Sequence, residues 1–134
     1  MNSTTNSACA ALIGGKVASV RDVPDPDAPS ALGSLEIELK TGRVMHARPD
    51  GKRSCEIVIG PAPWEPRRWR DLTANLPFAF ARDAVISLAE PVELEREVVG
   101  MRVVFANGGH FVYDVISGRP RLRASTDDIS GATS

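Results

Sequence analysis

The stretch SLEIELKTGRVMHARPDGKRSCEIVIG, residues 34–60, carries the clearest pattern in this chain. Leucine and isoleucine alternate with charged residues at its start, and two shorter segments of the same kind follow. The pairs Thr41-Gly42 and Asp50-Gly51 separate the segments, and both are typical of tight turns. Because a period of two places apolar side chains on one face of a strand, this stretch predicts a three-stranded antiparallel meander with one apolar face.

Three further segments flank the meander. Residues 15–23 alternate apolar and polar side chains and predict a first strand, which a proline-rich acidic loop follows at 24–33. Residues 84–94 also predict a strand, with a break at Pro91. Residues 101–115 predict a second hairpin, because an Asn-Gly-Gly turn separates two alternating segments.

One segment has a helical period instead. Pro66 suits the first turn of a helix, where its missing N–H leaves no bond unmade. Trp69, Leu72 and Leu76 follow at the spacing of one helix face, and Pro77 ends the segment. The period therefore predicts one helix among the strands.

Together these segments predict a β-dominated α+β fold, with about six antiparallel strands in a curved or barrel-like sheet and one packed helix near residues 65–76. The two hairpins also resemble each other. LEIELKTGRVMHA from Leu35 and MRVVFANGGHFVY from Met101 both contain a strand, a turn with glycine in its third position, and a second strand. Such a repeat would suit a sheet or barrel built from two similar halves, although hairpins of equal length also look alike by chance.

Length and composition are those of one globular domain, with 134 residues, 43% of them hydrophobic and 25% charged. We expect this single domain to span residues 11–124. The small polar residues 1–10 predict a flexible leader, and residues 125–134 predict a disordered tail. Since the formal net charge is −1, the chain has no global basic field, and any nucleic-acid binding must come from a local patch.

The N-terminal residues and the cysteines bear on location. The first residues lack the basic and apolar segments of a secretion signal, and no apolar run approaches the roughly 20 residues of a membrane-spanning helix. Cys9 and Cys55 form no disulfide framework or metal-binding spacing, so we expect reduced thiols. These features predict a cytoplasmic protein with no membrane partner. The excess of arginine over lysine, 13 to 3, is typical of a GC-rich bacterial genome.

The stretch GPAPWEPRRWRDL, residues 60–72, is the first candidate binding site. Its aromatic and basic residues are Trp64, Arg67, Arg68, Trp69 and Arg70. At the start of a helix, where free N–H groups favour anions, these side chains would hold a phosphate, stack a base or meet a partner's carboxylates. The structural interpretation, which we favour, places Trp69 in the core and pairs Arg67 with Asp71.

The sequence GRPRLR, residues 118–123, is the second candidate. If it forms a strand, Arg119, Arg121 and Arg123 share one face. Three guanidinium groups in a row suit phosphates or a carboxylate-rich partner. The structural alternative, which we favour, is a ladder of cross-strand ion pairs. The alternating acidic residues available for such a ladder are Glu93, Glu95, Glu97, Glu36 and Glu38.

Both histidines, His46 and His110, lie outside any metal-binding or catalytic spacing. His110, Phe111 and Tyr113 are a candidate pocket between helix and sheet, although the two aromatic residues are more simply explained as core. The sequence contains no nucleophile motif, phosphate-binding loop or distinctive pair of acids. It therefore predicts no catalytic residue, no metal and no cofactor.

Three functions are compatible with these patterns. The first, which we favour, is a small non-catalytic interaction protein of the immunity, inhibitor or accessory type, whose ligand is another protein or a second copy of the chain. The second is a nucleic-acid- or anion-binding β-barrel, which requires the two arginine clusters to converge in space. The third is a small enzyme or ligand-binding domain, which requires a histidine in an apolar cavity beside a hydrogen-bonded carboxylate.

Overall fold

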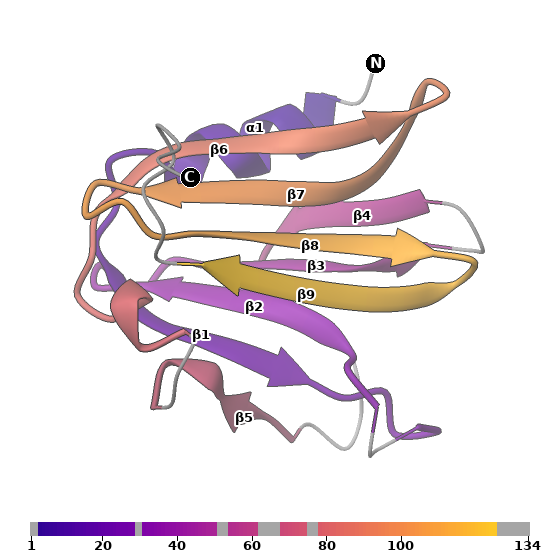
Figure 1. The fold of residues 1–134 in the computed structure, drawn as a ribbon, viewed down its shortest axis with the longest axis horizontal. Coiled ribbons are helices and arrows are strands. Elements are labelled where there is room, and N and C mark those ends of the chain that lie inside the picture. Colours follow the sequence, from indigo (N-terminus) through magenta and orange to yellow (C-terminus); the bar gives the residue numbers. More distant parts are fainter. Residues whose placement is uncertain (1–2, 29–30, 51–53, 62–67, 75–77, 126–134) are drawn as a thin grey trace.

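Two antiparallel sheets and one α-helix make up the part of the chain that the computed structural model describes, residues 3–28, 31–50, 54–61, 68–74 and 78–125. One sheet has the strand order β4-β3-β2-β1-β5, and the other has the order β6-β7-β8-β9 (Figure 1). The strands are β1 Val17–Val23, β2 Ser34–Leu39, β3 Val44–Asp50, β4 Ser54–Ile59, β5 Arg70–Asp71, β6 Ile86–Leu94, β7 Glu97–Phe105, β8 His110–Ile116 and β9 Arg119–Ser125. The helix α1 spans Ser3–Leu12, and two short 3-10 helices span η1 Leu72–Ala74 and η2 Ala79–Ala81.

The predicted meander forms β2, β3 and β4. Its register aligns Leu35 with Ala47 and Ala47 with Ile57, and all three side chains are fully buried. They lie on one face because their strands alternate with a period of two. The second predicted hairpin is confirmed as β7 and β8, where Val103 lies opposite Phe111.

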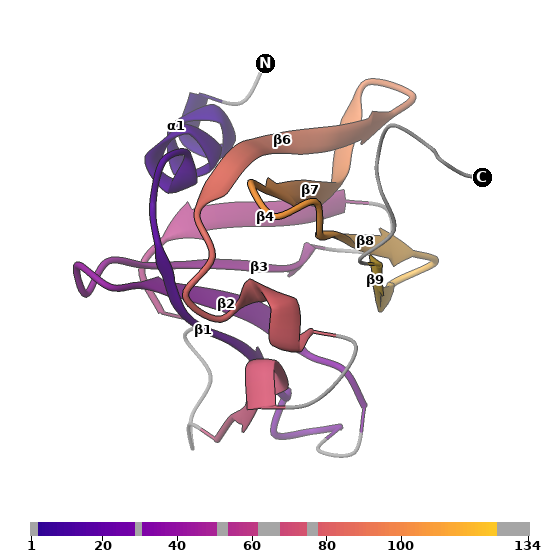
Figure 2. The same cartoon turned by 60° about the vertical axis from the view of Figure 1, so that its left-hand side comes forward.

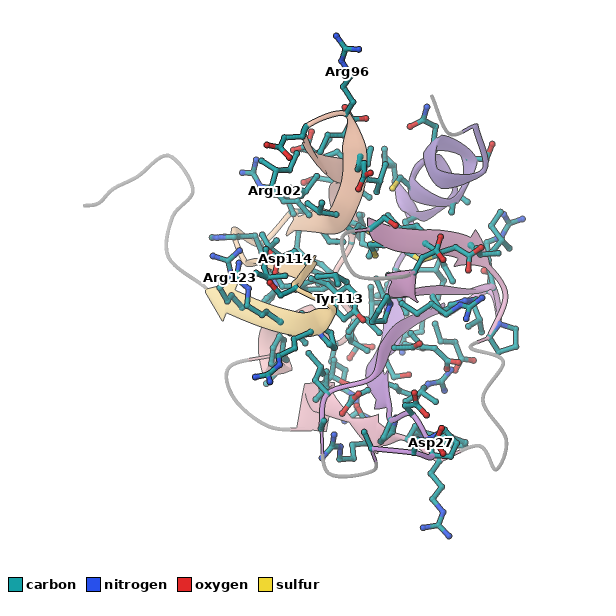
Figure 3. The ribbon with its side chains drawn as sticks, turned by 90° about the vertical axis from the view of Figure 1, so that its right-hand side faces the viewer. Asp27, Arg96, Arg102, Tyr113, Asp114 and Arg123 are labelled. Carbon is teal, nitrogen blue, oxygen red and sulfur yellow. The ribbon has the colours of Figure 1, made fainter. Side chains whose placement is uncertain are left out.

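The two sheets pack face to face around one core, and Figure 3 shows side chains filling the space between them. The first sheet contributes residues such as Ile37 and Met45, and the second contributes Met101, Phe111 and Tyr113. The predicted β-dominated α+β class is confirmed. The sheets are open rather than closed into a barrel.

The N-terminal residues are helical from Ser3 onward rather than flexible. Ala8, Cys9 and Leu12 of α1 are buried in the shared core. Because α1 carries no charged residue and only weak helical periodicity, its stability comes from packing against β4 and β6. This packing corrects the predicted leader over residues 3–10. At the other end, the predicted tail lies outside the described residues from 126 onward.

The helix predicted near residues 65–76 is wrong for 68–74, the residues that the structure describes there. Arg70 and Asp71 form β5, in which Arg70 lies opposite Asp22 of β1. The guanidinium of Arg70 also donates a hydrogen bond to the Asp22 carboxylate. These long-range contacts override the local helical spacing. The remainder of the predicted helix lies outside the described residues.

The backbone joins the segments that lead into the two halves of the predicted repeat. An isolated bridge between Lys16 and Val85 joins the segments that lead into β1 and β6, and four hydrogen bonds surround it. They run from Gly14 N–H to Ile86 O at 2.7 Å, from Ile86 N–H to Gly15 O at 2.9 Å, from Val17 N–H to Ala84 O at 2.9 Å and from Asp83 N–H to Val17 O at 2.9 Å. If each residue in these four bonds is replaced by the residue at the equivalent position of the other half, each bond becomes another of the four.

The repeat continues through the hairpin turns. Gly42 between β2 and β3 and Gly108 between β7 and β8 both have a φ of 94°, a left-handed conformation that glycine adopts without strain. Their N–H groups donate to equivalent carbonyls, Gly42 to Leu39 at 2.8 Å and Gly108 to Phe105 at 3.0 Å. Since β4 follows β3 as β9 follows β8, β4 and β9 are the equivalent last strands of the two halves.

The two cysteines are free and buried. Burial raises the pKa of Cys9 to about 11 and that of Cys55 to about 12, because it disfavours the thiolate, and the nearby charge of Glu90 adds to the effect at Cys9. We expect neither thiol to react with a thiol-specific reagent at pH 8 in the folded protein, and both to react after unfolding in guanidinium chloride. Rapid labelling of the folded protein would contradict this.

These raised pKa values also predict how stability depends on pH. Below the ordinary thiol pKa of 9.0, both thiols are protonated in the folded and unfolded states. Above it, the unfolded chain releases protons that the folded chain keeps, so the free energy of unfolding falls as the pH rises from 9 to about 11. A Cys9→Ala, Cys55→Ala double variant should show a shallower decline in urea unfolding. Equal declines in both proteins would count against the assignment.

Candidate interaction surface on the second sheet

The predicted Trp/Arg site falls only partly within the described residues, because Trp64 and Arg67 lie outside them. Trp69 is 52% exposed, so it is a surface residue rather than the core residue of a helix. The guanidinium carbon of Arg21 lies 5.3 Å from the centroid of its ring, which is a cation–π contact. Arg68 is exposed and forms no ion pair with another described residue.

Arg70 belongs to a structural cluster around Asp22, a carboxylate that is 1% exposed. The guanidinium of Arg70 donates to Asp22 and, at 3.3 Å, to the carbonyl of Ala31. The other oxygen of Asp22 accepts the N–H of Gly33 at 2.8 Å. The carbonyl of Gly33 accepts the hydroxyl of Tyr113 at 2.7 Å. This cluster therefore fastens the loop between β1 and β2 to both sheets.

The second arginine cluster forms a row on β9, as the alternation predicts. Arg121 lies opposite Asp114 of β8, and Arg123 lies opposite Val112. The Asp114 carboxylate accepts two hydrogen bonds from Arg121 and one from Arg123, each at 3.0 Å. Figure 3 shows Asp114 and Arg123 together on the outer side of this sheet. Arg119, at the start of the row, is exposed and forms no ion pair within the described part of the chain.

Hydrogen bonding to Asp114, and then its negative charge, raises the pKa of Arg121. Sequence reasoning missed Asp114, because it looked for partners among alternating glutamates. The signal was nevertheless present in the Ser117-Gly118 turn. A two-residue turn fixes the hairpin register, and this register places Asp114 directly opposite Arg121.

The described members of the two arginine clusters belong to different sheets or to the segment just before one. Arg70 belongs to the first sheet and pairs with Asp22, whereas Arg121 and Arg123 belong to the second sheet and pair with Asp114. Among the described strands, β5 pairs with β1 and β9 pairs with β8. Arg70 on one sheet, and Arg121 and Arg123 on the other, therefore pair with different buried carboxylates.

The predicted pocket of His110, Phe111 and Tyr113 is not assembled either. Phe111 and Tyr113 are fully buried in the core, whereas His110 alternates to the outer face of β8. His46 is 5% exposed, and its Nδ1–H donates to the carbonyl of Gly60 at 2.8 Å. Within the described ranges, neither histidine bonds a carboxylate, and no cluster of His, Cys, Asp and Glu is suited to a metal ion.

The edge of β9 is the open feature of the second sheet. Among the described strands, β9 pairs only with β8, and Figure 1 shows it as the outermost strand. The turn before it consists of Ser117 and Gly118, with φ angles of 52° and 78°. Such a two-residue turn makes its flanking residues, Ile116 and Arg119, a hydrogen-bonded pair.

This register determines which backbone groups of β9 are open. Bonding alternates along an antiparallel ladder, so the N–H and C=O groups of Leu122 and Ala124 point away from β8. Pro120 takes the remaining outward position, where its missing N–H removes no bond to β8. The edge therefore offers two consecutive outward N–H and C=O sets for pairing.

A cavity of about 350 Å³ adjoins the start of β9. Its apolar walls come from the loop before β2, from β3 and from β9 itself, through Ala28, Ala31, Leu32, Pro49 and Pro120. The Asp22 cluster holds this loop in place through Ala31 and Gly33. The free edge thus lies beside a space that can receive an apolar side chain.

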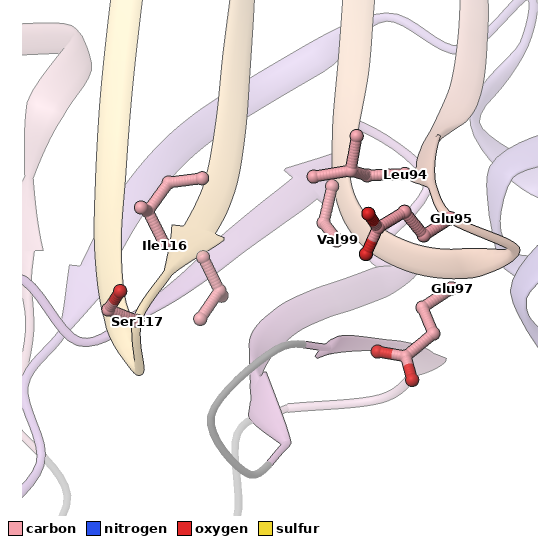
Figure 4. A pocket seen from close by; sticks show the side chains of 7 residues that line it. Leu94, Glu95, Glu97, Val99, Ile116 and Ser117 are labelled. Carbon is pink, nitrogen blue, oxygen red and sulfur yellow. The ribbon is translucent and has the colours of Figure 1, made fainter.

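A second cavity, of about 480 Å³, lies between the β6–β7 and β8–β9 turns. Its apolar walls are Leu94, Val99, Val115 and Ile116. In Figure 4, Glu95 and Glu97 project from one turn, across from Ile116 and Ser117 of the other. The polar side chains among the described residues that line it are Glu95, Glu97 and Ser117.

The two halves of the fold cover their last strands differently. In the first half, α1 packs against β4 and β6, as Figure 2 shows. In the second half, the described residues before β6 form β5, η1 and η2, which pack against β1. No described helix covers β9 as α1 covers β4.

No protein-family model, no curated protein and no solved structure matches this chain. In the described residues, no helix has the length and apolar character needed to cross a membrane.

Proposed function

We propose that this chain is a non-catalytic interaction protein that binds a protein partner along the edge of β9. The observation that carries the proposal is the difference between two equivalent strands. β4 packs against α1, whereas no described strand pairs with the outward backbone groups of Leu122 and Ala124 on β9. An exposed strand edge is a template for an added strand, whose main-chain hydrogen bonds supply affinity.

The chemistry of the described residues favours binding over catalysis. His46 bonds a backbone carbonyl, and His110 lies on the outer face of β8. Among the described residues that line the cavity beside β9 there is no histidine, cysteine, serine or tyrosine. An immunity, inhibitor or accessory role in a bacterial cytoplasm fits a domain of this kind, and this part of the proposal rests on composition and on two buried, free thiols.

One backbone substitution tests the proposal. Leu122→Pro removes an outward N–H without removing a bond to β8, as Pro120 already does two residues earlier. Leu122→Ala removes the same side chain but keeps the N–H. In affinity capture from extracts of the cells that make the protein, we expect the wild type and Leu122→Ala to retain a partner, and Leu122→Pro to lose it.

Circular dichroism must show that both variants fold before capture is compared. A partner retained equally by Leu122→Pro and Leu122→Ala would show that the β9 edge is not the binding surface. A partner lost in both variants would assign binding to the Leu122 side chain, and would contradict strand addition.

A further inference from the structure

We infer that the β9 edge selects an acidic strand, one with carboxylates at alternate positions and apolar residues between them. This inference rests on the proposed function, because it names the chemistry of the partner at the same edge. It combines three features of the described residues: the arginine row, the open backbone groups and the cavity beside them.

The charge on the outer face supplies the first argument. Arg119, Arg121 and Arg123 stand in a row on β9, and among the described residues Asp114 is the one carboxylate that pairs with this row. The side chains of Arg121 and Arg123 stay 49% and 61% exposed despite these bonds. An added strand places its own side chains directly beside this row. Carboxylates at every second position would therefore meet guanidinium groups that still have free N–H donors.

The same charges argue against a second copy of the chain as the partner. Antiparallel pairing of β9 with another β9 would bring Arg119, Arg121 and Arg123 close to the same residues of the copy. Like charges on adjacent strands destabilise the pair. The row therefore disfavours pairing between two copies of the chain and favours an acidic partner. The same three charges both protect the edge from self-association and discriminate between partners.

The cavity supplies the third argument. Side chains of an added strand alternate between the outer face, where the arginines lie, and the inner face. On the inner side, the cavity of about 350 Å³ has apolar walls from Leu32, Pro49 and Pro120. An apolar residue next to each carboxylate in the sequence of the partner would point toward this space. The expected motif is therefore alternating acidic and aliphatic residues.

Synthetic peptides test the inference directly. The first probe has 7 residues, the length of β9, and alternates glutamate with valine or isoleucine. Two matched peptides replace every glutamate by threonine or by lysine. A single-stranded oligonucleotide and sedimentation of the protein alone complete the set. Fluorescence anisotropy measures the dissociation constants.

We expect the glutamate peptide to bind, and the threonine peptide to bind about tenfold more weakly or worse, since three favourable cross-strand pairs are lost. The lysine peptide should show no binding. Arg119→Gln should weaken binding of the glutamate peptide, whereas Arg43→Gln, which removes an exposed arginine from the β2–β3 turn of the other sheet, should not. Leu122→Pro should abolish binding that Leu122→Ala retains.

The other outcomes are separable. Equal affinity for the glutamate and threonine peptides, with loss in Leu122→Pro, would overturn the acidic selection and leave strand addition standing. No sensitivity to Leu122→Pro would overturn strand addition as well. Tighter binding of the oligonucleotide, unaffected by Leu122→Pro, would assign the arginine row to nucleic acid. Dimers at micromolar concentration that Leu122→Pro dissociates would replace the acidic partner with a second copy.

Discussion

Replacing Asp22 with alanine should lower the free energy of unfolding by about 3 kcal/mol, measured by urea unfolding at pH 7. The carboxylate is 1% exposed and accepts hydrogen bonds from Gly33 and Arg70. Alanine would leave the Gly33 N–H buried without its acceptor. It would also release Arg70, whose side chain is 52% exposed and can regain water. Loss of the buried acceptor is therefore the larger part of the expected cost.

Two substitutions separate the buried cluster from ordinary ion pairing. Asp22→Asn keeps an oxygen for the Gly33 N–H and should cost less than Asp22→Ala. Glu90→Ala breaks a surface pair with Arg102, in which the two side chains are 43% and 38% exposed, and should cost less than about 1 kcal/mol. Equal losses in the free energy of unfolding for Asp22→Ala and Glu90→Ala would show that the Asp22 cluster stabilises the fold no more than a surface ion pair does.

Asp22 also links stability to the proposed site. Its bond to Gly33 holds the loop before β2, and this loop forms one wall of the cavity beside β9. If the Asp22→Ala variant remains folded in the absence of denaturant, it should therefore bind the alternating acidic peptide more weakly than the wild type. Since Asp22 is 1% exposed and bonds Gly33 and Arg70, this effect would identify it as a positioning residue rather than a contact.

Strands with a clear period of two could be predicted from the sequence, since alternation is a local property. The three strands at residues 34–60 and the hairpin of β7 and β8 have it. The predicted break at Pro91 was wrong, because β6 continues through this residue opposite Met101. β6 is an edge strand, and a proline can be accommodated there without disrupting the sheet.

The predicted leader over residues 3–10 and the helix predicted near residues 65–76 differ from α1 and β5 because tertiary contacts decide both segments. In α1, Ala8, Cys9 and Leu12 gain their burial from β4 and β6, which the local composition does not reveal. In β5, Arg70 gains a long-range partner in Asp22, which outweighs the helical spacing of nearby apolar residues. α1 precedes β1 and β5 precedes β6, so the two halves of the repeat differ at equivalent positions along the chain.

That difference also explains how much of the candidate site could be predicted. The arginine row of β9 follows from local alternation. The open edge beside it depends on the absence of a covering helix from the described residues of the second half, and this is a property of the whole fold. Asp114 could also have been predicted, but only by working out the register of the β8–β9 hairpin from its two-residue turn.

Gly100→Ala should destabilise the protein by about 3 kcal/mol, because the second sheet has no room for a side chain there. Gly100 of β7 lies opposite Asp114 of β8. A Cβ added at Gly100 would lie 2.2 Å from the carbonyl oxygen of Tyr113 and 2.7 Å from the Cβ of Asp114. The first of these atoms is backbone, so β7 and β8 would have to separate. The measurement is again urea unfolding of the wild type and the variant.

The turn glycines provide matched controls for this prediction. At Gly42 and Gly108, an added Cβ would meet no atom within 4 Å, but each residue has a φ of 94°. Alanine at either position should cost about 1 kcal/mol, from backbone strain alone. A loss at Gly100 no larger than at these turns would show that β7 and β8 adapt easily. We expect a larger loss of stability at Gly100. If the displaced Asp114 no longer orients Arg121 and Arg123, the Gly100→Ala variant should also bind the acidic peptide more weakly.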